Sequence, residues 1–144
     1  MEIDKMKNRA VVASLDKRFN KQKDKIRKAS LEILKILNQK SVLVEIYLAS
    51  GAKMRILNRR FKGKDKPTDI LSFPEPRNFP HPGLKLRNLG EIYLYLDYFR
   101  KNLVRHDYRY LLTHGILHLL GYDHKKKNDR IKMNKKEQLV IKKL

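Results

Sequence analysis

Three histidines stand close together near the end of the sequence. His114 and His118 are four residues apart in an apolar stretch that predicts a helix, so both imidazoles would project from one helix face, about one turn apart. Gly121 would end that helix, after which the chain can bring His124 back to the same point. Three histidine nitrogens around one point are typical of a metal site, and we predict that His114, His118 and His124 bind a metal ion.

The spacing of these residues indicates a catalytic zinc site. The pattern H-x-x-x-H-x-x-G-x-x-H matches the zinc-binding frame of the metzincin proteases in its three ligands and its glycine. Three protein ligands leave a fourth tetrahedral position for water, which zinc converts into a nucleophile near neutral pH. The proteases use a glutamate directly after the first histidine as a general base, but this sequence has Gly115 there. One Zn²⁺ per chain is therefore expected, whereas peptide hydrolysis by that mechanism is disfavoured.

Hydrophobic periodicity predicts the helices that must hold this site. Apolar residues at three- and four-residue spacing predict helices over residues 20–37 and about 54–61, and we expect a last basic helix from Lys125 onward. Asp107 suits the N-cap of the helix that carries the first two histidines, and Gly121 suits its left-handed end.

Strand patterns complete the expected fold. Alternating apolar residues predict strands over residues 41–48 and 89–96, and two prolines bracket another strand-length run at 68–73. Glu2–Asp4 is a possible short edge strand in a weakly patterned first segment. The order β-α-β-α-β-β-α-α predicts an α+β fold with a single domain over residues 1–144, in which a small mixed sheet of about four strands packs with helices and a zincin-like tri-histidine metal site lies at a helix end.

The amino-acid composition narrows the classes of binding partner and of chemistry. The chain has 35 Lys and Arg against 15 Asp and Glu, a formal charge of +20, and 41% hydrophobic residues. A polyanion such as nucleic acid is the partner that this charge favours, although lysines spread over solvated faces explain it about as well. The chain has no cysteine, so thiol chemistry is excluded. No apolar stretch approaches the roughly 20 residues of a membrane-spanning helix, and we expect a cytoplasmic protein without a membrane partner.

Several motifs together resemble one known family. The stretch H-G-I-L-H-L-L-G-Y-D-H at residues 114–124 looks like the signature of the YbeY family of rRNA maturation factors, which are single-domain metal-dependent endoribonucleases. Leu57–Asn58, the run G-K-D-K-P-T-D-I-L-S-F-P at residues 63–74 and the segment Leu89–Ile92 are similar to further segments of that family. The likeness covers about residues 42–144.

The resemblance implies a zinc-dependent endoribonuclease, a hydrolase that cuts phosphodiester bonds in single-stranded RNA. It would act in rRNA maturation, at the late processing of the 3′ end of 16S rRNA, and in ribosome quality control. The implied partners are rRNA and the small ribosomal subunit, with no small-molecule cofactor and with no prediction of the oligomeric state. The alternative is a non-catalytic, zinc-stabilised rRNA-binding assembly factor. A minimal metalloprotease is a third hypothesis, which Gly115 opposes.

Two departures from the family pattern affect the expected mechanism. Lys62 stands where the resemblance places a functional arginine, so the charge is kept but the planar fork that binds phosphate is lost. Lys62 and the neighbouring Arg60 are the candidates that would offset the charge developing on the phosphate. Glu91 stands where the family has aspartate, one methylene shorter. No residue is identified as the general base.

Other residues have two interpretations each. Asp123 precedes a ligand and could orient an imidazole, or it could cap the turn after Gly121. Thr68, Asp69 and Ser72 could hold substrate or water, or be ordinary strand-end residues. The remaining histidines, His81 and His106, are expected to be exposed rather than ligands. The tyrosines that could stack on RNA bases, although core or rim positions explain most of them, are Tyr93, Tyr95, Tyr98, Tyr108 and Tyr110.

Overall fold

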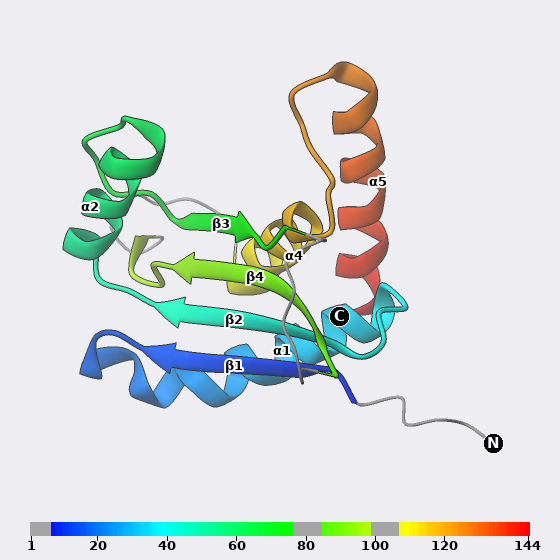
Figure 1. Cartoon of the computed structure of the whole chain (residues 1–144), viewed down its shortest axis with the longest axis horizontal. Coiled ribbons are helices and arrows are strands. Elements are labelled where there is room, and N and C mark those ends of the chain that lie inside the picture. Colours follow the sequence, from blue (N-terminus) through cyan, green and yellow to red (C-terminus); the bar gives the residue numbers. More distant parts are fainter. Residues whose placement is uncertain (1–6, 77–84, 99–106) are drawn as a thin grey trace.

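The computed structural model describes residues 7–76, 85–98 and 107–144, and its centre is a mixed four-stranded sheet (Figure 1). The strands, in chain order, are β1 (Arg9–Ser14), β2 (Val42–Leu48), β3 (Ile70–Pro74) and β4 (Arg87–Leu94). Their order across the sheet is β1-β2-β4-β3. The first three strands in this order run parallel, and β3 pairs antiparallel with β4 at the edge. The predicted α+β fold with a small mixed sheet is confirmed.

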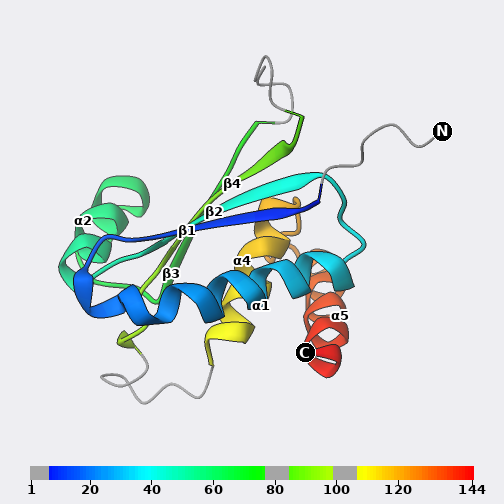
Figure 2. The same cartoon turned by 90° about the horizontal axis from the view of Figure 1, so that it is seen from below.

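Two helices, α1 (Lys23–Ile36) and α4 (Tyr108–Leu119), pack on one face of this sheet, and α5 (Lys127–Lys143) packs on these two helices (Figure 2). Helix α2 (Gly51–Lys62) lies at one end of the sheet and packs against its other face. The strand sequences explain this asymmetry. Alternate residues of β2, such as Val44 and Ile46, are fully buried with the core of the helices, while Glu45 and Tyr47 between them are only partly buried. The sheet therefore has one apolar face and one mixed face.

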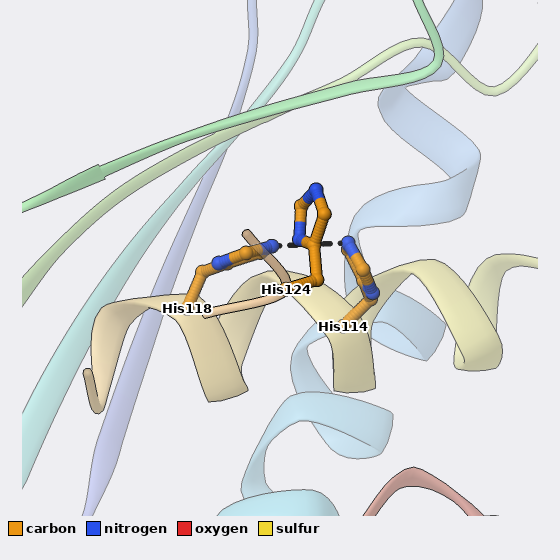
Figure 3. A group of neighbouring side chains, drawn as sticks. All are labelled: His114, His118 and His124. Atoms are coloured by element: carbon orange, nitrogen blue, oxygen red, sulfur yellow. Dashed lines mark hydrogen bonds between the residues drawn. The ribbon is translucent and has the colours of Figure 1, made fainter. Parts of the chain in front are cut away.

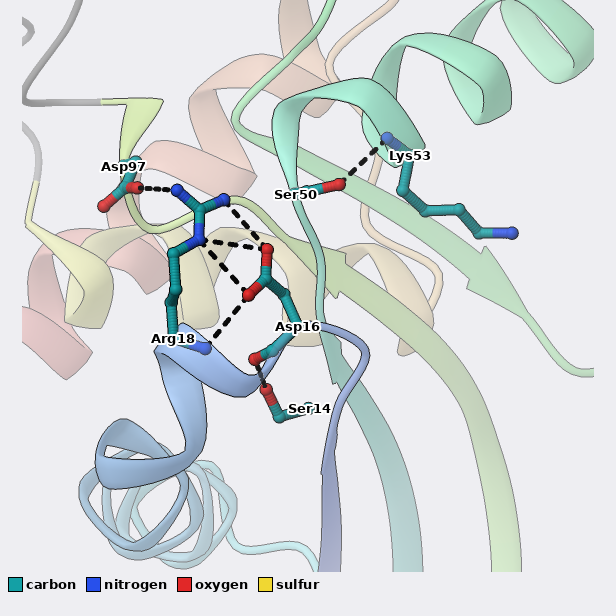
Figure 4. A network of polar contacts seen from close by, with 6 residues as sticks. All are labelled: Ser14, Asp16, Arg18, Ser50, Lys53 and Asp97. Atoms are coloured by element: carbon teal, nitrogen blue, oxygen red, sulfur yellow. Dashed lines mark hydrogen bonds and ion pairs between the residues drawn. The ribbon is translucent and has the colours of Figure 1, made fainter.

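Polar side chains determine where the early helices begin (Figure 4). The hydroxyl of Ser50 accepts a backbone N–H of the first turn of α2 at 3.2 Å. Asp16 does the same for a 3-10 segment, η1 (Lys17–Gln22), through the N–H of Arg18 at 2.9 Å. The Arg18 guanidinium also binds the Asp16 carboxylate and approaches the carboxylate of Asp97 to 3.9 Å. These contacts tie η1, the segment that leads into α1, to the segment after β4.

The helix ends differ from the predictions where capping was not recognised. The predicted helix over residues 20–37 is divided into η1 and α1. Helix α2 begins at Gly51, earlier than predicted, because Ser50 caps it, and it ends as predicted at Gly63, whose φ is 71°. The expected strand at 68–73 begins only at Ile70.

Strand β1 was not predicted. Its apolar residues Val11–Ala13 form too short a run to stand out among polar neighbours. Its place is set by long-range pairing with β2, which sequence periodicity does not reveal. The possible strand at Glu2–Asp4 lies outside the described residues. Among the helices of the described ranges, none is long and apolar enough to cross a membrane.

Candidate metal centre

Helix α4 fixes two of the three histidines. The carboxylate of Asp107 accepts two backbone N–H groups of the first turn, at 2.9 and 3.1 Å, as the sequence predicted. Leu112 and Ile116 are fully buried in the main core. His114 and His118 project from another side of the helix and stay partly exposed. The apolar side therefore anchors the helix, and the two imidazoles are held one turn apart.

The turn after α4 brings the third histidine back to the other two (Figure 3). Gly121 has a φ of 100°, a left-handed conformation that favours glycine. The carboxylate of Asp123 then accepts the backbone N–H groups of His124 and of the next residue, at 2.6 and 3.1 Å. As a result, one ring nitrogen from each of the three histidines lies within 4.8 Å of the others. The structure thus brings together the cluster that the spacing predicted.

Hydrogen bonds to the outer ring nitrogens set the tautomers of two histidines. Nδ1 of His118 lies 3.0 Å from the carbonyl oxygen of Tyr122, which can only accept, so Nδ1 donates. Nδ1 of His114 lies 2.7 Å from a carboxylate oxygen of Glu137 and donates in the same way. In the neutral rings both Nε2 atoms are then unprotonated. They point at each other across 3.1 Å.

This arrangement fits a metal ion. Two unprotonated nitrogens at 3.1 Å repel unless a cation lies between their lone pairs. A tetrahedral zinc ion, with Zn–N bonds of about 2.0–2.1 Å, would hold two nitrogens about 3.3 Å apart. Burial, with the neighbouring His114 and His124, lowers the pKa of His118, so the neutral form that binds metals is favoured. The donor set of three imidazoles therefore suits a divalent transition metal.

Glu137 is the functional residue that the sequence analysis missed. It lies on α5 and is 2% exposed. Burial alone would raise the pKa of Glu137, but hydrogen bonds from His114 and Tyr110 outweigh it and hold the pKa below its usual value. The buried carboxylate is thus ionised and fixes the ring of His114. The sequence did contain an indication that Glu137 is buried. It shares its helix face with the buried Met133 and Val140, at spacings of four and three residues.

Asp123 lies in the turn. Its carboxylate binds the backbone N–H groups described above rather than an imidazole. The oxygen atoms that orient the rings come instead from the Tyr122 carbonyl and from Glu137. This placement favours the turn-capping interpretation of Asp123, through which it positions His124.

The three histidines open into a cleft of about 600 Å³ beside the edge strand β3. Two lysines line it, Lys62 from the end of α2 and Lys125 directly after His124. Asp69 and Ser72 line it as well, whereas Thr68 and Arg60 do not. The residues that make up the cleft are Lys62, Asp69, Ile70, Leu71, Ser72, Pro74, His114, His118, Gly121, Tyr122, Asp123, His124 and Lys125.

The packing around position 115 explains why a glycine is found there. A Cβ atom at this position would lie 2.8 Å from Cδ1 of Ile70 and 3.1 Å from both Cδ1 of Ile92 and Oγ of Ser72. Helix α4 thus approaches β3 and β4 closely at Gly115, and position 115 faces the sheet. A glutamate here, as metzincins have, would push these three side chains aside and would face the sheet.

Glu91, which stands where the family pattern has aspartate, lies on the face of the sheet away from the histidines. Ile92 faces α4, so its neighbour Glu91 projects from the opposite face of the sheet, where it accepts a hydrogen bond from the hydroxyl of Tyr93 at 3.2 Å. Of the tyrosines considered for base stacking, Tyr95 is buried at 4% exposure and Tyr93 is half-buried against Tyr47. His81 and His106 lie outside the described residues.

Comparisons with known proteins agree on one family. A family model described as "Endoribonuclease YbeY" matches residues 5–144. A relative of that name from Sulfurihydrogenibium sp. (strain YO3AOP1) is 39% identical over 71% of this chain and 69% of its own length. Another, from Aquifex aeolicus, is 35% identical over 97% of this chain and 94% of its own. The solution structure of TM1509 from Thermotoga maritima is similar with a TM-score of 0.53 and 25% identity, covering 93% and 90% of the two chains.

Replacing Glu137 with glutamine tests its role in orienting His114. We expect Glu137→Gln to weaken zinc binding about 10- to 100-fold, because the amide removes the charge that stabilises the Nδ1–H of His114. Competition with a chromophoric zinc chelator measures the affinity. Asp129→Asn, which removes a carboxylate from the first turn of the same helix, is the matched control and should retain wild-type affinity. Equal affinities for both variants would show that Glu137 does not orient the ligand.

Proposed function

The chain belongs to the YbeY endoribonuclease family, and on that premise we propose that it is a zinc-dependent endoribonuclease that cuts single-stranded RNA in the cytoplasm. Its substrate would be rRNA of the small ribosomal subunit, at the late processing of the 3′ end of 16S rRNA and in ribosome quality control. The observation that carries the proposal is the pair of Nε2 atoms of His114 and His118, 3.1 Å apart, beside His124 and in a cleft flanked by lysines.

His114, His118 and His124 would hold the zinc ion. When bound, zinc supplies a Lewis acid that polarises a phosphodiester and lowers the pKa of water. Glu137 and the Tyr122 carbonyl keep two rings in the tautomer that ligation needs. Asp123 keeps the turn closed so that His124 stays within reach.

Two lysines would hold the phosphate backbone. Lys62 and Lys125 belong to different elements and both line the cleft, so an RNA strand that crosses the histidines meets an ammonium from each. These charges would offset the negative charge that develops on the phosphate. Arg60 does not line the cleft. Its guanidinium stands 5.5 Å from the centre of the Phe61 ring, which favours a contact with RNA outside the cleft over the catalytic role considered for it.

Asp69 is our candidate for the proton acceptor. Two aspartates line the cleft, but the backbone N–H groups of the turn occupy Oδ1 of Asp123. The carboxylate of Asp69 accepts one long hydrogen bond, from the hydroxyl of Thr68 at 3.3 Å. It can therefore take a proton from attacking water at its carboxylate oxygen.

The two other hypotheses make different predictions. An assembly factor would bind RNA in the presence of zinc without cutting it. A peptidase of the metzincin type would need a glutamate directly after His114 as its general base, and this chain has Gly115 there.

A cleavage assay distinguishes these hypotheses. The purified chain is incubated with a labelled single-stranded RNA, a duplex of the same sequence and a peptide panel, with and without a chelator. We expect cleavage of the single strand alone, lost with chelator and restored by zinc. Binding without cleavage would replace the proposal with the assembly factor, and chelator-sensitive peptide cleavage would replace it with the peptidase.

Substitutions at Lys62 test the phosphate contact. Because Lys62 lines the cleft as a single ammonium, Lys62→Met should lower the cleavage rate about 100-fold, whereas Lys62→Arg should equal or exceed the wild type. Lys53→Met, on the first turn of the same helix, is the control and should cut RNA normally. Wild-type rates for Lys62→Met would remove Lys62 from the mechanism.

Substitution of Asp69 tests the proton acceptor. Asp69→Asn keeps the shape but cannot take the proton, so kcat should fall about 100-fold while zinc content and RNA affinity stay unchanged. Single-turnover cleavage by the zinc-loaded protein adds a second readout, because it separates the chemical step from product release. The variant should be slow in this assay as well. A wild-type single-turnover rate in the variant would assign the proton to another group.

A further inference from the structure

The last turn of α2 carries side chains to both faces of the sheet edge. Lys62 lines the histidine cleft, which lies on the α4 side of β3. Its neighbour Phe61 contacts Phe73, whose ring lies on the opposite face, because Ser72 between Phe73 and Leu71 faces α4. The two side chains project about 100° apart around the helix, so an RNA strand that leaves the cleft at Lys62 and passes around the edge strand would reach Phe61.

The side chain of Phe61 is largely exposed, although another aromatic ring packs against it. It is 54% exposed, at the end of a helix rich in lysine and arginine. The ring of Phe73 lies 5.0 Å away at 61°, and Phe73 in turn contacts Tyr93 at 5.8 Å. Tyr93 stacks on Tyr47 at 5.0 Å. This row of rings crosses the mixed face of the sheet from its β3 edge and holds Phe61 in place. A ligand ring that stacks on Phe61 would therefore find its side chain already ordered.

The surroundings of Phe61 favour a polyanion that carries flat rings. The Arg60 guanidinium stands 5.5 Å from the centre of the Phe61 ring, and guanidinium planes also stack on nucleobases. Lys62 and Lys64 follow within three residues. An apolar protein partner would have to desolvate these charges, whereas RNA supplies phosphates to pair with them and bases to stack.

We propose that Phe61, flanked by Arg60, is a stacking subsite for one unpaired nucleobase of the RNA substrate, next to the stretch of backbone held by Lys62. This inference rests on the proposed function, since it assigns a flanking contact to the same substrate. It also supplies a reason for single-strand selectivity. A base in a duplex is already stacked on its neighbours and cannot lie on Phe61 without unpairing.

Binding to RNA with missing bases tests the subsite. The zinc-loaded full chain is titrated with labelled single-stranded RNA about 12 nucleotides long, and the affinity is measured by fluorescence anisotropy. Electrophoresis after each titration checks that the RNA is intact. A series of oligonucleotides then carries one abasic nucleotide at each position in turn. Phe61→Leu keeps an apolar contact with Phe73 but removes the ring, and Phe61→Tyr and Phe61→Trp restore one.

We expect Phe61→Leu to weaken binding of single-stranded RNA about 5- to 100-fold and to leave duplex binding unchanged. The salt dependence of the affinity should stay the same, because no charge is removed. In the wild type, removing the base at one position of the RNA should weaken binding about as much as Phe61→Leu does. In the Phe61→Leu variant, removing the same base should weaken binding no further. Phe61→Tyr and Phe61→Trp should bind as the wild type does.

Two controls keep the inference separate from folding and from catalysis. Ile56, also on α2 and 51% exposed, is the matched apolar control, and Ile56→Ala should bind RNA normally. If the chain binds RNA with this coupling but never cuts it, the proposed function fails and the subsite stands. If it cuts RNA and Phe61→Leu binds like the wild type, or if no abasic position couples to Phe61, the subsite is wrong and Phe61 serves packing or a protein contact.

Discussion

Two histidine nitrogens that face each other at 3.1 Å are the constraint on which the rest of the structure depends. Such a contact is unfavourable without a cation, so the fold must hold both rings against it. The apolar side of α4 does so by burying Leu112 and Ile116, and Gly115 lets the helix approach the sheet closely. Helix α5 contributes the buried carboxylate of Glu137. The energy of core packing is thus used to keep two lone pairs directed at one point, where a metal ion relieves their repulsion.

In the proposed function, the same packing separates most of the metal site from the contacts to the substrate. His114 and His118 are held by α4, whose apolar side is buried against the sheet, whereas Lys62 reaches the cleft from the end of α2. His124 is exposed and shares the turn after α4 with Lys125. Phe61 extends this division to the other face of the edge strand. The two helical ligands of the proposed metal centre are therefore held by the core, while the proposed contacts to single-stranded RNA come from the exposed rim. Lys62, which stands where the family pattern has arginine, belongs to α2, whereas the three histidines belong to α4 and the turn after it.

How much of this was predictable depended on the range of the interactions. The cluster of His114, His118 and His124 followed from spacing, since a helix repeat and a glycine turn are local. The caps at Asp107 and Gly63 were likewise visible in the sequence. Strand β1 was not, because its pairing with β2 joins segments about thirty residues apart. Glu137 was missed for the same reason, since its partner His114 is 23 residues away. The absence of a glutamate at Gly115 was evident, but its cause, the close approach to Ile70, required the structure.

The most direct test of the account is the zinc content of the purified chain, measured by elemental mass spectrometry beside two histidine variants. His114→Ala removes a ligand, and His81→Ala removes a histidine that lies outside the motif. We predict about one zinc per chain in the wild type and in His81→Ala, and a large loss of zinc in His114→Ala. Zinc retained in full by His114→Ala, or no zinc in the wild type even after incubation with excess zinc salt, would contradict it.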